Sequence, residues 1–171
     1  MNRLPDISSQ AHWTVSTSKH GFGVTNLHDN NPDTFWQSDG QLPHSISIKF
    51  PHRQPIHTIA LYLDFDKDES YTPCCIRVYA GTSKYDMQLV NDHQFTKEPR
   101  GWVHLRLADI SGPLLLAHFL FIELPMNYES GRDVHVRLAK VLGPAPKEEK
   151  FRKEKILPFT TEEFHMYDTL R

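Results

Sequence analysis

The clearest feature of the sequence is a series of short stretches in which apolar and polar residues alternate. In residues 44–50, Ile46, Ile48 and Phe50 fall on one side, and residues 58–65 repeat this pattern with four apolar side chains. A period of two is expected when one face of a β-strand is buried. Similar stretches, which we interpret as further strands, lie at 76–80, 85–90, 102–107, 114–124 and 136–142.

Three of these stretches also indicate which face of the strand is apolar. Residues 85–90 predict a strand that carries Met87 and Leu89 on its apolar side. Residues 102–107 alternate apolar side chains with Trp102, His104 and Arg106. In residues 114–124 the aliphatic side chains alternate with Phe119, Phe121 and other residues, so both faces are apolar and the strand is expected to be central.

Seven or eight short strands separated by Pro, Gly, Asp and Asn turns, with scarcely any helical periodicity, predict an all-β fold. The most suitable architecture is an antiparallel jelly-roll β-sandwich. Before these strands, residues 8–19 predict an edge strand or extended lead-in, and residues 24–29 predict a short helical turn with Val24 and Leu27 facing inward. We expect residues 1–143 to form one domain without internal repeats.

The composition changes at residues 143–146, GPAP, and a mixed charge run, KEEKFRKEK, follows. We interpret residues 144–159 as a solvated linker whose last apolar residues either add a strand or pack back on the sheet. Residues 160–171 place Phe164, Tyr167 and Leu170 at helical spacing. A helix of that length is marginal alone, so this segment is expected to be a flexible tail that docks on a partner.

Residues 30–44 form the polar loop on which the rest of the chain is organised. They contain one aromatic pair, Phe35 and Trp36, between clusters of turn-forming residues. We expect Trp36 to lie in the core and the following residues, from Ser38 to His44, to be presented for binding. The alternative is an ordinary β-turn in which Asp39 bonds only its own backbone.

Composition excludes several classes of partner and location. The chain has 171 residues and a formal net charge of −2, which gives no field for nucleic acid or an anionic membrane. The N-terminus lacks a signal-peptide core, and the longest apolar run is well short of the ~20 residues that span a bilayer. The two cysteines, Cys74 and Cys75, are adjacent, which disfavours a disulfide between them and predicts a reducing compartment.

No motif predicts an enzyme, a metal site or a cofactor. Neither a nucleophile elbow nor a phosphate-binding glycine loop is present. Asp64, Asp66 and Asp68 resemble the start of a calcium loop, but Glu69 and Cys75 stand where that loop needs Gly and Glu. Histidines are numerous but lack zinc-ligand spacing. A hydrolase with paired carboxylates stays open, because a sheet can bring distant acids together.

Three polar loops, at 38–44, 68–73 and 129–135, are the best candidates for a binding site. Loops at one end of a jelly roll can form a shared surface. Arg132 suits a bidentate pair with a carboxylate, and Asp39 and Asp133 suit hydrogen bonds from peptide or sugar donors. Alternatively, Arg132 and Asp133 pair with nearby groups and only hold the loop.

Four sequence blocks in these regions show a resemblance to a known family. They are GFGVTNLHDNNPDTFWQSDGQLPH, DESYTP, GWVH and GRDVHVR, in that order. Together they closely resemble the DOC domain of subunit 10 of the anaphase-promoting complex, over nearly the whole chain. The family has a galactose-binding-like jelly roll, which agrees with the strands predicted independently above.

The resemblance implies a non-catalytic subunit of a multi-subunit ubiquitin ligase, present in nucleus and cytoplasm during the cell cycle. With a β-propeller co-activator, such subunits form a co-receptor for the destruction box of substrates and raise processivity. The substrate-binding residues predicted from the loops and the resemblance are Ser38, Asp39, Gly40, His44, Ser70, Tyr71, Ser130, Gly131, Arg132, Asp133 and His135.

Two departures from the family pattern lie in the third loop. Ser130 stands where Asn is expected and Val134 where Thr is expected, which puts two side-chain hydrogen bonds in doubt. Family members also end in Ile-Arg, which docks into a tetratricopeptide-repeat subunit, whereas this chain ends in Leu170 and Arg171. These residues keep the apolar volume, the guanidinium and the terminal carboxylate, so we expect docking to be retained.

Two other functions stay open. A carbohydrate-binding module is compatible with the fold, because fold does not determine function. Sugar binders usually show exposed aromatic rings, so burial of Trp36 and Trp102 would count against it. A hydrolytic domain would require a pair of carboxylates in a deep cleft, and a shallow end surface would exclude it.

Overall fold

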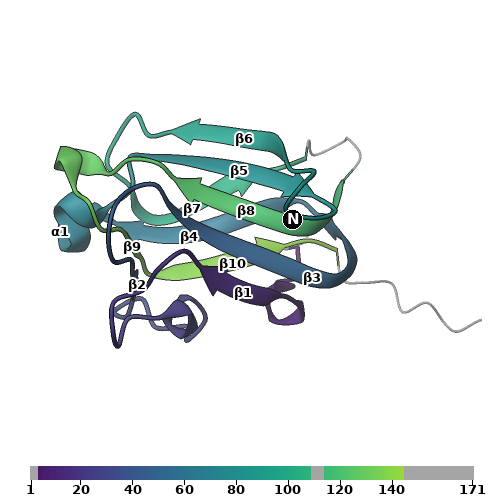
Figure 1. Cartoon of the computed structure of the whole chain (residues 1–171), viewed down its shortest axis with the longest axis horizontal. Coiled ribbons are helices and arrows are strands. Elements are labelled where there is room, and N and C mark those ends of the chain that lie inside the picture. Colours follow the sequence, from purple (N-terminus) through teal and green to yellow (C-terminus); the bar gives the residue numbers. More distant parts are fainter. Residues whose placement is uncertain (1–3, 109–113, 145–171) are drawn as a thin grey trace, which may run out of the picture.

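The structure is a computed structural model that describes residues 4–108 and 114–144. Five strands form one antiparallel sheet in the order β1-β3-β8-β5-β6, and three form a second in the order β10-β4-β7. A two-stranded ribbon, β2-β9, lies beside them. Figure 1 shows the two larger sheets as stacked layers. The predicted all-β antiparallel sandwich is therefore confirmed.

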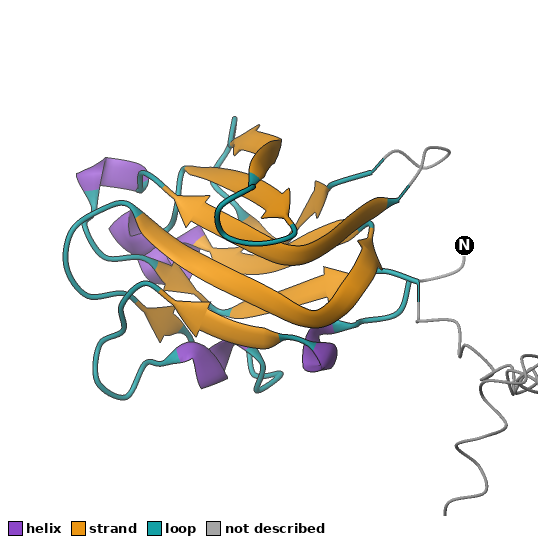
Figure 2. Ribbon diagram, turned by 45° about the vertical axis from the view of Figure 1, so that its right-hand side comes forward, coloured by secondary structure: helices purple, strands orange, loops and turns teal. Residues whose placement is uncertain are grey.

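The ten strands are β1 (His12–Val15), β2 (Trp36–Gln37), β3 (His44–Ile56), β4 (Thr58–Asp64), β5 (Cys75–Gly81), β6 (Gln88–Gln94), β7 (Arg100–Arg106), β8 (Leu115–Leu124), β9 (His135–Val136) and β10 (Leu138–Leu142). The helical elements are single turns: η1 (Ser8–Gln10), η2 (Val24–Leu27), α1 (Phe65–Asp68), η3 (Glu69–Tyr71) and η4 (Tyr128–Ser130). Figure 2 shows that these turns lie outside the sheets. None of the helices in 4–108 or 114–144 is long and apolar enough to cross a membrane.

The hydrophobic core lies between the two larger sheets. The inward side chains of β3, such as Ile46 and Ile48, are fully buried, as are Ile59 and Leu61 of β4. This follows from the period of two in the sequence, because alternate side chains of a strand point to one face. Trp36 is also fully buried, and its Nε1 donates to the Thr17 carbonyl at 2.9 Å. The prediction that Trp36 lies in the core is confirmed.

The order of strands bears out the role predicted for residues 114–124. Strand β8 is the middle strand of the larger sheet, between β3 and β5, and β1 is an edge strand as expected. The predicted turn at 24–29 is the 3-10 helix η2, in which Leu27 is buried and Val24 is half-buried. Both cysteines are free, and Cys75 is buried in β5.

The prediction for residues 85–90 is wrong in its start and its face. Strand β6 begins at Gln88, because the preceding turn is held by Asp86, which accepts hydrogen bonds from Ser83 and Thr82. Leu89 is 51% exposed, and Val90 packs against the core instead. A bulge in the pairing of β5 with β6 accompanies this reversal, which the alternation alone could not reveal.

Strand β3 also differs from the sequence pattern, because it continues past Phe50 through Pro51 to Ile56. Its pairing with β8 shifts between Lys49 and Gln54, so the segment that contains Pro51 bulges out of the ladder. The long strand leads directly into β4 through the turn at His57. As a result, the His57 end of the sandwich is opposite the end at which α1 follows β4.

Candidate functional site

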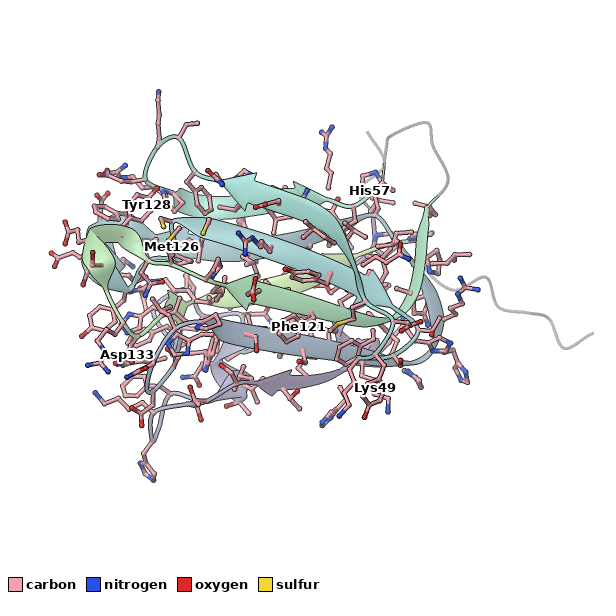
Figure 3. All side chains as sticks on the ribbon, turned by 45° about the horizontal axis from the view of Figure 1, so that its top comes forward. Lys49, His57, Phe121, Met126, Tyr128 and Asp133 are labelled. Atoms are coloured by element: carbon pink, nitrogen blue, oxygen red, sulfur yellow. The ribbon has the colours of Figure 1, made fainter. Side chains whose placement is uncertain are left out.

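The predicted loops gather at one end of the sandwich. Figure 1 shows α1, β9 and β2 together at this end, and Figure 3 shows Asp133 and Tyr128 there, away from His57 and Lys49. The loop after β2, the turns α1 and η3, and the segment from η4 to β9 all contribute. We call this region the loop surface. It consists of residues 38–43, 68–72 and 128–135.

Two predicted binding residues hold the loops together instead of facing solvent. Ser38 is fully buried, and its Oγ accepts a hydrogen bond from the Val134 N–H at 2.8 Å. His44 is 1% exposed, and its Nε2 donates to the Arg132 carbonyl at 2.8 Å. Their polar atoms are therefore already used, which corrects the expectation that these side chains contact a ligand directly. They position the backbone on which Arg132 is mounted.

His135 is a second correction, because its ring is buried inside the loop surface. It stacks between Phe35 and Tyr71, with centroid separations of 4.1 and 4.3 Å. Its Nδ1 donates to Asp68 Oδ1 at 3.0 Å. The Nε2 atom is buried and has no partner among the described residues. The side chain therefore supports Tyr71 from below, and Phe22 extends the stack behind Phe35.

A buried ion pair lies beneath this stack. Arg137 donates from Nε to Asp68 Oδ2 at 2.8 Å and from Nη2 to Asp68 Oδ1 at 2.6 Å, and the two side chains are only 5% and 2% exposed. Burial opposes ionisation of Asp68, but the hydrogen bonds from His135 and Arg137 outweigh it and lower its pKa. Arg137 also donates to the Pro32 carbonyl at 2.8 Å, which fixes the loop before β2.

The sequence did not identify Arg137 or the structural role of Asp68. Arg137 follows His135 at a spacing of two, which in an extended chain places both side chains on one face, although Arg137 itself lies between β9 and β10. That spacing was the available signal. Asp68 was interpreted as part of an acidic loop, and its partners lie 67 and 69 residues away, so their pairing could not be inferred.

Glycine at position 131 is required by a close approach of two loops. A Cβ atom placed there would lie 1.8 Å from the Ser70 carbonyl oxygen. The preceding residues, Glu129 and Ser130, have positive φ angles of 52° and 60°. Asparagine is enriched in this conformation, which gives a physical reason for the family preference at position 130. Val134 is fully buried, so a threonine hydroxyl there would point into an apolar environment.

Among the predicted binding residues, Asp39, Tyr71, Ser130 and Arg132 have exposed side chains, and Gln41, Pro43, Glu69 and Glu129 are exposed beside them on the loop surface. Tyr71 is 39% exposed although it is stacked on His135, so its outer edge remains available. Arg132 forms no ion pair within 4–108 and 114–144, which argues against the alternative that its side chain only holds the loop. Asp133 is half-buried, and its carbonyl accepts from Asn127 at 2.6 Å. Gly40 lies on the exposed rim with a φ of 111°.

The pKa shifts of two buried groups, Asp68 and Cys75, differ from those of common catalytic groups. Asp68 is the buried carboxylate at this end, and its lowered pKa keeps it ionised, whereas a general acid needs a raised pKa. Burial raises the pKa of the Cys75 thiol, which disfavours a nucleophilic thiolate. The described residues contain no group of three or more His, Cys, Asp or Glu side chains that could hold a metal ion.

The two tryptophans whose burial would count against a sugar-binding module differ in exposure. Trp36 is fully buried as predicted, but Trp102 is 39% exposed on β7. Burial of both rings would have counted against a sugar-binding module, and the exposure of Trp102 means that this condition is not met. The position of Trp102 on the outer side of a two-layer sandwich explains this exposure, because the three-stranded sheet has its core on the other face.

Comparison with known proteins identifies relatives over nearly the whole chain. A family model described as "Anaphase-promoting complex, subunit 10" matches residues 1–169. The subunit 10 of Schizosaccharomyces pombe is 41% identical over 167 residues, which are 97% of this chain and 87% of the relative. The subunit 10 of Homo sapiens is 37% identical over 166 residues, which are 97% of this chain and 88% of the relative.

Solved structures with a similar fold are more distant in sequence. A family 32 carbohydrate-binding module of C. perfringens NanJ in complex with galactose has a TM-score of 0.67 at 13% identity, and the match covers 82% of this chain and 98% of that module. The C-terminal domain of a chitobiase from Bacteroides fragilis has a TM-score of 0.62 at 21% identity, over 81% of this chain and 97% of that chain. These likenesses confirm the galactose-binding-like jelly roll and extend to the fold alone.

Proposed function

Because the chain belongs to the family of anaphase-promoting complex subunit 10, we propose that it recognises substrates for that ubiquitin ligase without catalysing a reaction itself. In this proposal the loop surface binds destruction-box degrons together with a β-propeller co-activator. The subunit thereby keeps each substrate bound for longer and raises the number of ubiquitins added per encounter.

The observation that carries this proposal is a set of accessible polar groups on rigid backbone. Arg132 is exposed, while its carbonyl is held by His44 and the adjoining loop is held by Ser38. Tyr71 is exposed on one edge and stacked on a buried histidine on the other. Binding costs less when the contact residues are already ordered, so such a surface suits a flexible peptide segment.

The exposed groups also match the chemistry of a peptide. The Arg132 guanidinium is a fork of donors for a carboxylate or for peptide carbonyl groups, and Asp39 accepts from peptide N–H groups or basic side chains. The Tyr71 ring supplies a rigid area for an apolar side chain. Recognition of this kind needs no cofactor or metal, and none is part of the proposal.

The tail extends the proposal to a second partner. Leu170 and Arg171 lie outside the described residues, and we propose that they dock into a tetratricopeptide-repeat subunit of the complex. The described chain ends at Pro144, next to β10, whose last residue Leu142 pairs with Thr58. Thr58 follows the His57 turn, so the described chain ends at the end of the sandwich opposite the loop surface. Degron binding at the loop surface and docking of Leu170 and Arg171 on a repeat subunit therefore need not compete in this proposal. A function of this kind places the protein in nucleus and cytoplasm.

A processivity assay tests the proposal. The purified complex is assembled with a subunit that carries Asp39→Ala and Arg132→Ala, and ubiquitins per substrate encounter are counted in single-encounter conditions. We expect shorter chains, because lost contacts mainly raise the dissociation rate. The matched control carries Asp92→Ala and Arg53→Ala, two exposed residues outside the loop surface. Equal chain lengths for the loop variant and the parent would contradict the proposal.

A further inference from the structure

Most sulfur atoms of the described residues gather at the start of β5. Cys74 and Cys75 are consecutive there, and both are free thiols. Met126 follows β8, the strand that pairs with β5, and Figure 3 shows sulfur atoms beside its label. The other methionine in the described residues, Met87, precedes β6 and lies at the opposite end of β5. Pairing of β5 with β8 therefore brings together sulfur atoms that the sequence keeps far apart.

Backbone pairing places Met126 opposite Cys74. The antiparallel register of β5 with β8 continues to an isolated bridge between Pro73 and Asn127. Within that register, the Cys74 N–H donates to the Met126 carbonyl at 3.0 Å. The Cα atoms of a directly opposed, hydrogen-bonded pair are about 5.5 Å apart in an antiparallel ladder. The side chains of Cys74 and Met126 can therefore reach the same ligand.

The second thiol, that of Cys75, adjoins both of these residues. Burial is the largest cause that raises the pKa of Cys75, and the neighbouring Cys74 thiol raises it further, whereas the Met126 N–H lowers it by bonding to the sulfur. The Tyr128 hydroxyl lies close by as well, because its pKa is raised first by burial and next by Cys74. A metal ion displaces the thiol proton, so a raised pKa does not prevent coordination.

The sulfur cluster is buried on one side and open on the other. Cys75 is 6% exposed and Cys74 is half-buried, whereas Met126 is 57% exposed. Methionine is flexible, so an ion can enter past the Met126 side chain. The carboxylate of β8, Glu123, already accepts hydrogen bonds from two side chains of β5. The side-chain donors that the two strands bring together at this position are therefore sulfur atoms.

From these features we infer that Cys74, Cys75 and Met126 bind one soft monovalent metal ion, Cu(I). Thiolate and thioether sulfur select Cu(I), whereas magnesium and calcium take oxygen ligands. A structural zinc site needs four ligands, but Cu(I) accepts two thiolates and a thioether. Binding joins the ion to the two thiol sulfurs and releases their two protons, without a change in oxidation state. The inference goes beyond the proposed degron recognition, because none of these side chains is a proposed degron contact.

A bound ion links the start of β5 to the segment that follows β8. Both lead directly into the loop surface, because Thr72 precedes the cysteine pair and Tyr128 follows Met126 closely. The two segments are already joined by the Tyr128 N–H, which donates to the Thr72 carbonyl at 2.9 Å. The metal site therefore adjoins the loop surface. An ion that binds the folded chain, in which the sulfur atoms are together, raises its stability.

Titration of the reduced full-length protein with Cu(I) in the absence of oxygen tests the inference, with bicinchoninate as the competing chelator. The chain has two cysteines, so an ultraviolet thiolate-to-copper charge-transfer band reports on these two thiols. Cys74→Ser and Cys75→Ser each remove one thiol and keep all 11 histidines. Met126→Leu removes the thioether at similar volume, and Met87→Leu is its matched control. Melting temperatures are measured without metal, and Cys74→Ser, at a half-buried site, keeps the test decisive if Cys75→Ser does not fold.

We expect one Cu(I) per parent chain, with the charge-transfer band and a raised melting temperature. The cysteine variants and Met126→Leu should each raise the Kd at least about tenfold, since even the outer partners of a metal site often contribute that much. Met87→Leu should bind like the parent. Parental affinity in Cys74→Ser would overturn the inference, because other donors would then hold the ion. Equal affinities of Met126→Leu and Met87→Leu would contradict the three-sulfur site, and thiol-dependent binding of Zn(II) as tight as that of Cu(I) would contradict the choice of ion.

Discussion

At the scale of single residues, the loop surface depends on Asp68. This carboxylate receives hydrogen bonds from both His135 and Arg137, and these are the side chains on which Tyr71 and the loop before β2 rest. Breaking a buried ion pair by removing one partner leaves an uncompensated charge. Asp68 therefore holds in place the side chains that support the exposed Tyr71 and the loop before β2.

Stability should depend on the ionisation of Asp68. Its pKa is lowered in the folded protein, so its contribution to the free energy of unfolding is complete above the ordinary carboxyl pKa of about 4 and is lost as pH falls through the lowered value. Urea unfolding between pH 7 and pH 3 measures this dependence. Asp68→Asn should cost about 3–5 kcal/mol at pH 7, because Arg137 stays buried without its counter-charge.

The acid dependence of the variant is the informative comparison. As the pH falls below 4, the free energy of unfolding should decrease less for Asp68→Asn than for the parent, because the titrating carboxyl group is gone. If the parent and the variant lose stability in parallel below pH 4, Asp68 is not ionised in the way that the geometry indicates.

At the scale of elements, the loop surface is produced by close packing of turns from different parts of the chain. The turn η4 approaches η3 so closely that the Gly131 position cannot hold a Cβ atom without moving the Ser70 backbone. Backbone cannot give way as a flexible side chain can. The spacing of the two turns, and with it the distance from Tyr71 to Arg132, is therefore set by a glycine.

Gly131→Ala should separate these turns. We expect lower stability by about 1–3 kcal/mol, the range for overpacking, together with reduced processivity of the assembled complex. Gly23→Ala is the matched control, because a Cβ there has nothing within 4 Å and the φ of −87° is ordinary. Unfolding in urea gives the stability of each variant. A Gly131→Ala protein that matches Gly23→Ala in both properties would show that the close approach is not needed.

The strands also show which parts of the fold could be predicted from the sequence. Alternation located most strands, because one buried face gives a period of two that is visible in β4 and β7. Alternation failed where the pairing is irregular. The bulge beside β6 leaves Leu89 exposed and turns Val90 toward the core, and β3 continues beyond Pro51.

The three candidate loops were predicted from the sequence, but the use of their side chains was not. Its three loops were identified because they are rich in polar and turn-forming residues, and the structure brings them together. Polarity alone could not show that Ser38 and His44 are buried, since their partners, Val134 and Arg132, lie 96 and 88 residues away. Long-range hydrogen bonds convert polar loop residues into interior ones, and sequence spacing contains no signal for them.

At the scale of the whole molecule, the sandwich separates its surfaces. The loop surface is at one end, the described chain ends at the other, and the outer face of β10, β4 and β7, which carries the exposed Trp102, forms a side between them. The proposed degron contacts therefore lie away from the end at which the described chain stops. Neither larger sheet has to move for the surfaces to be used together.

The most direct test of the central claim is site-specific photo-crosslinking from the loop surface. A photoreactive amino acid replaces Arg132 in the assembled complex, and a labelled destruction-box substrate is added with co-activator. A control complex carries the same group in place of Arg53 on β3, outside the loop surface. We predict a crosslink to the degron from position 132 alone, abolished by excess unlabelled degron peptide. No crosslink from position 132 in a complex that binds the substrate, or equal crosslinking from both positions, would contradict the account.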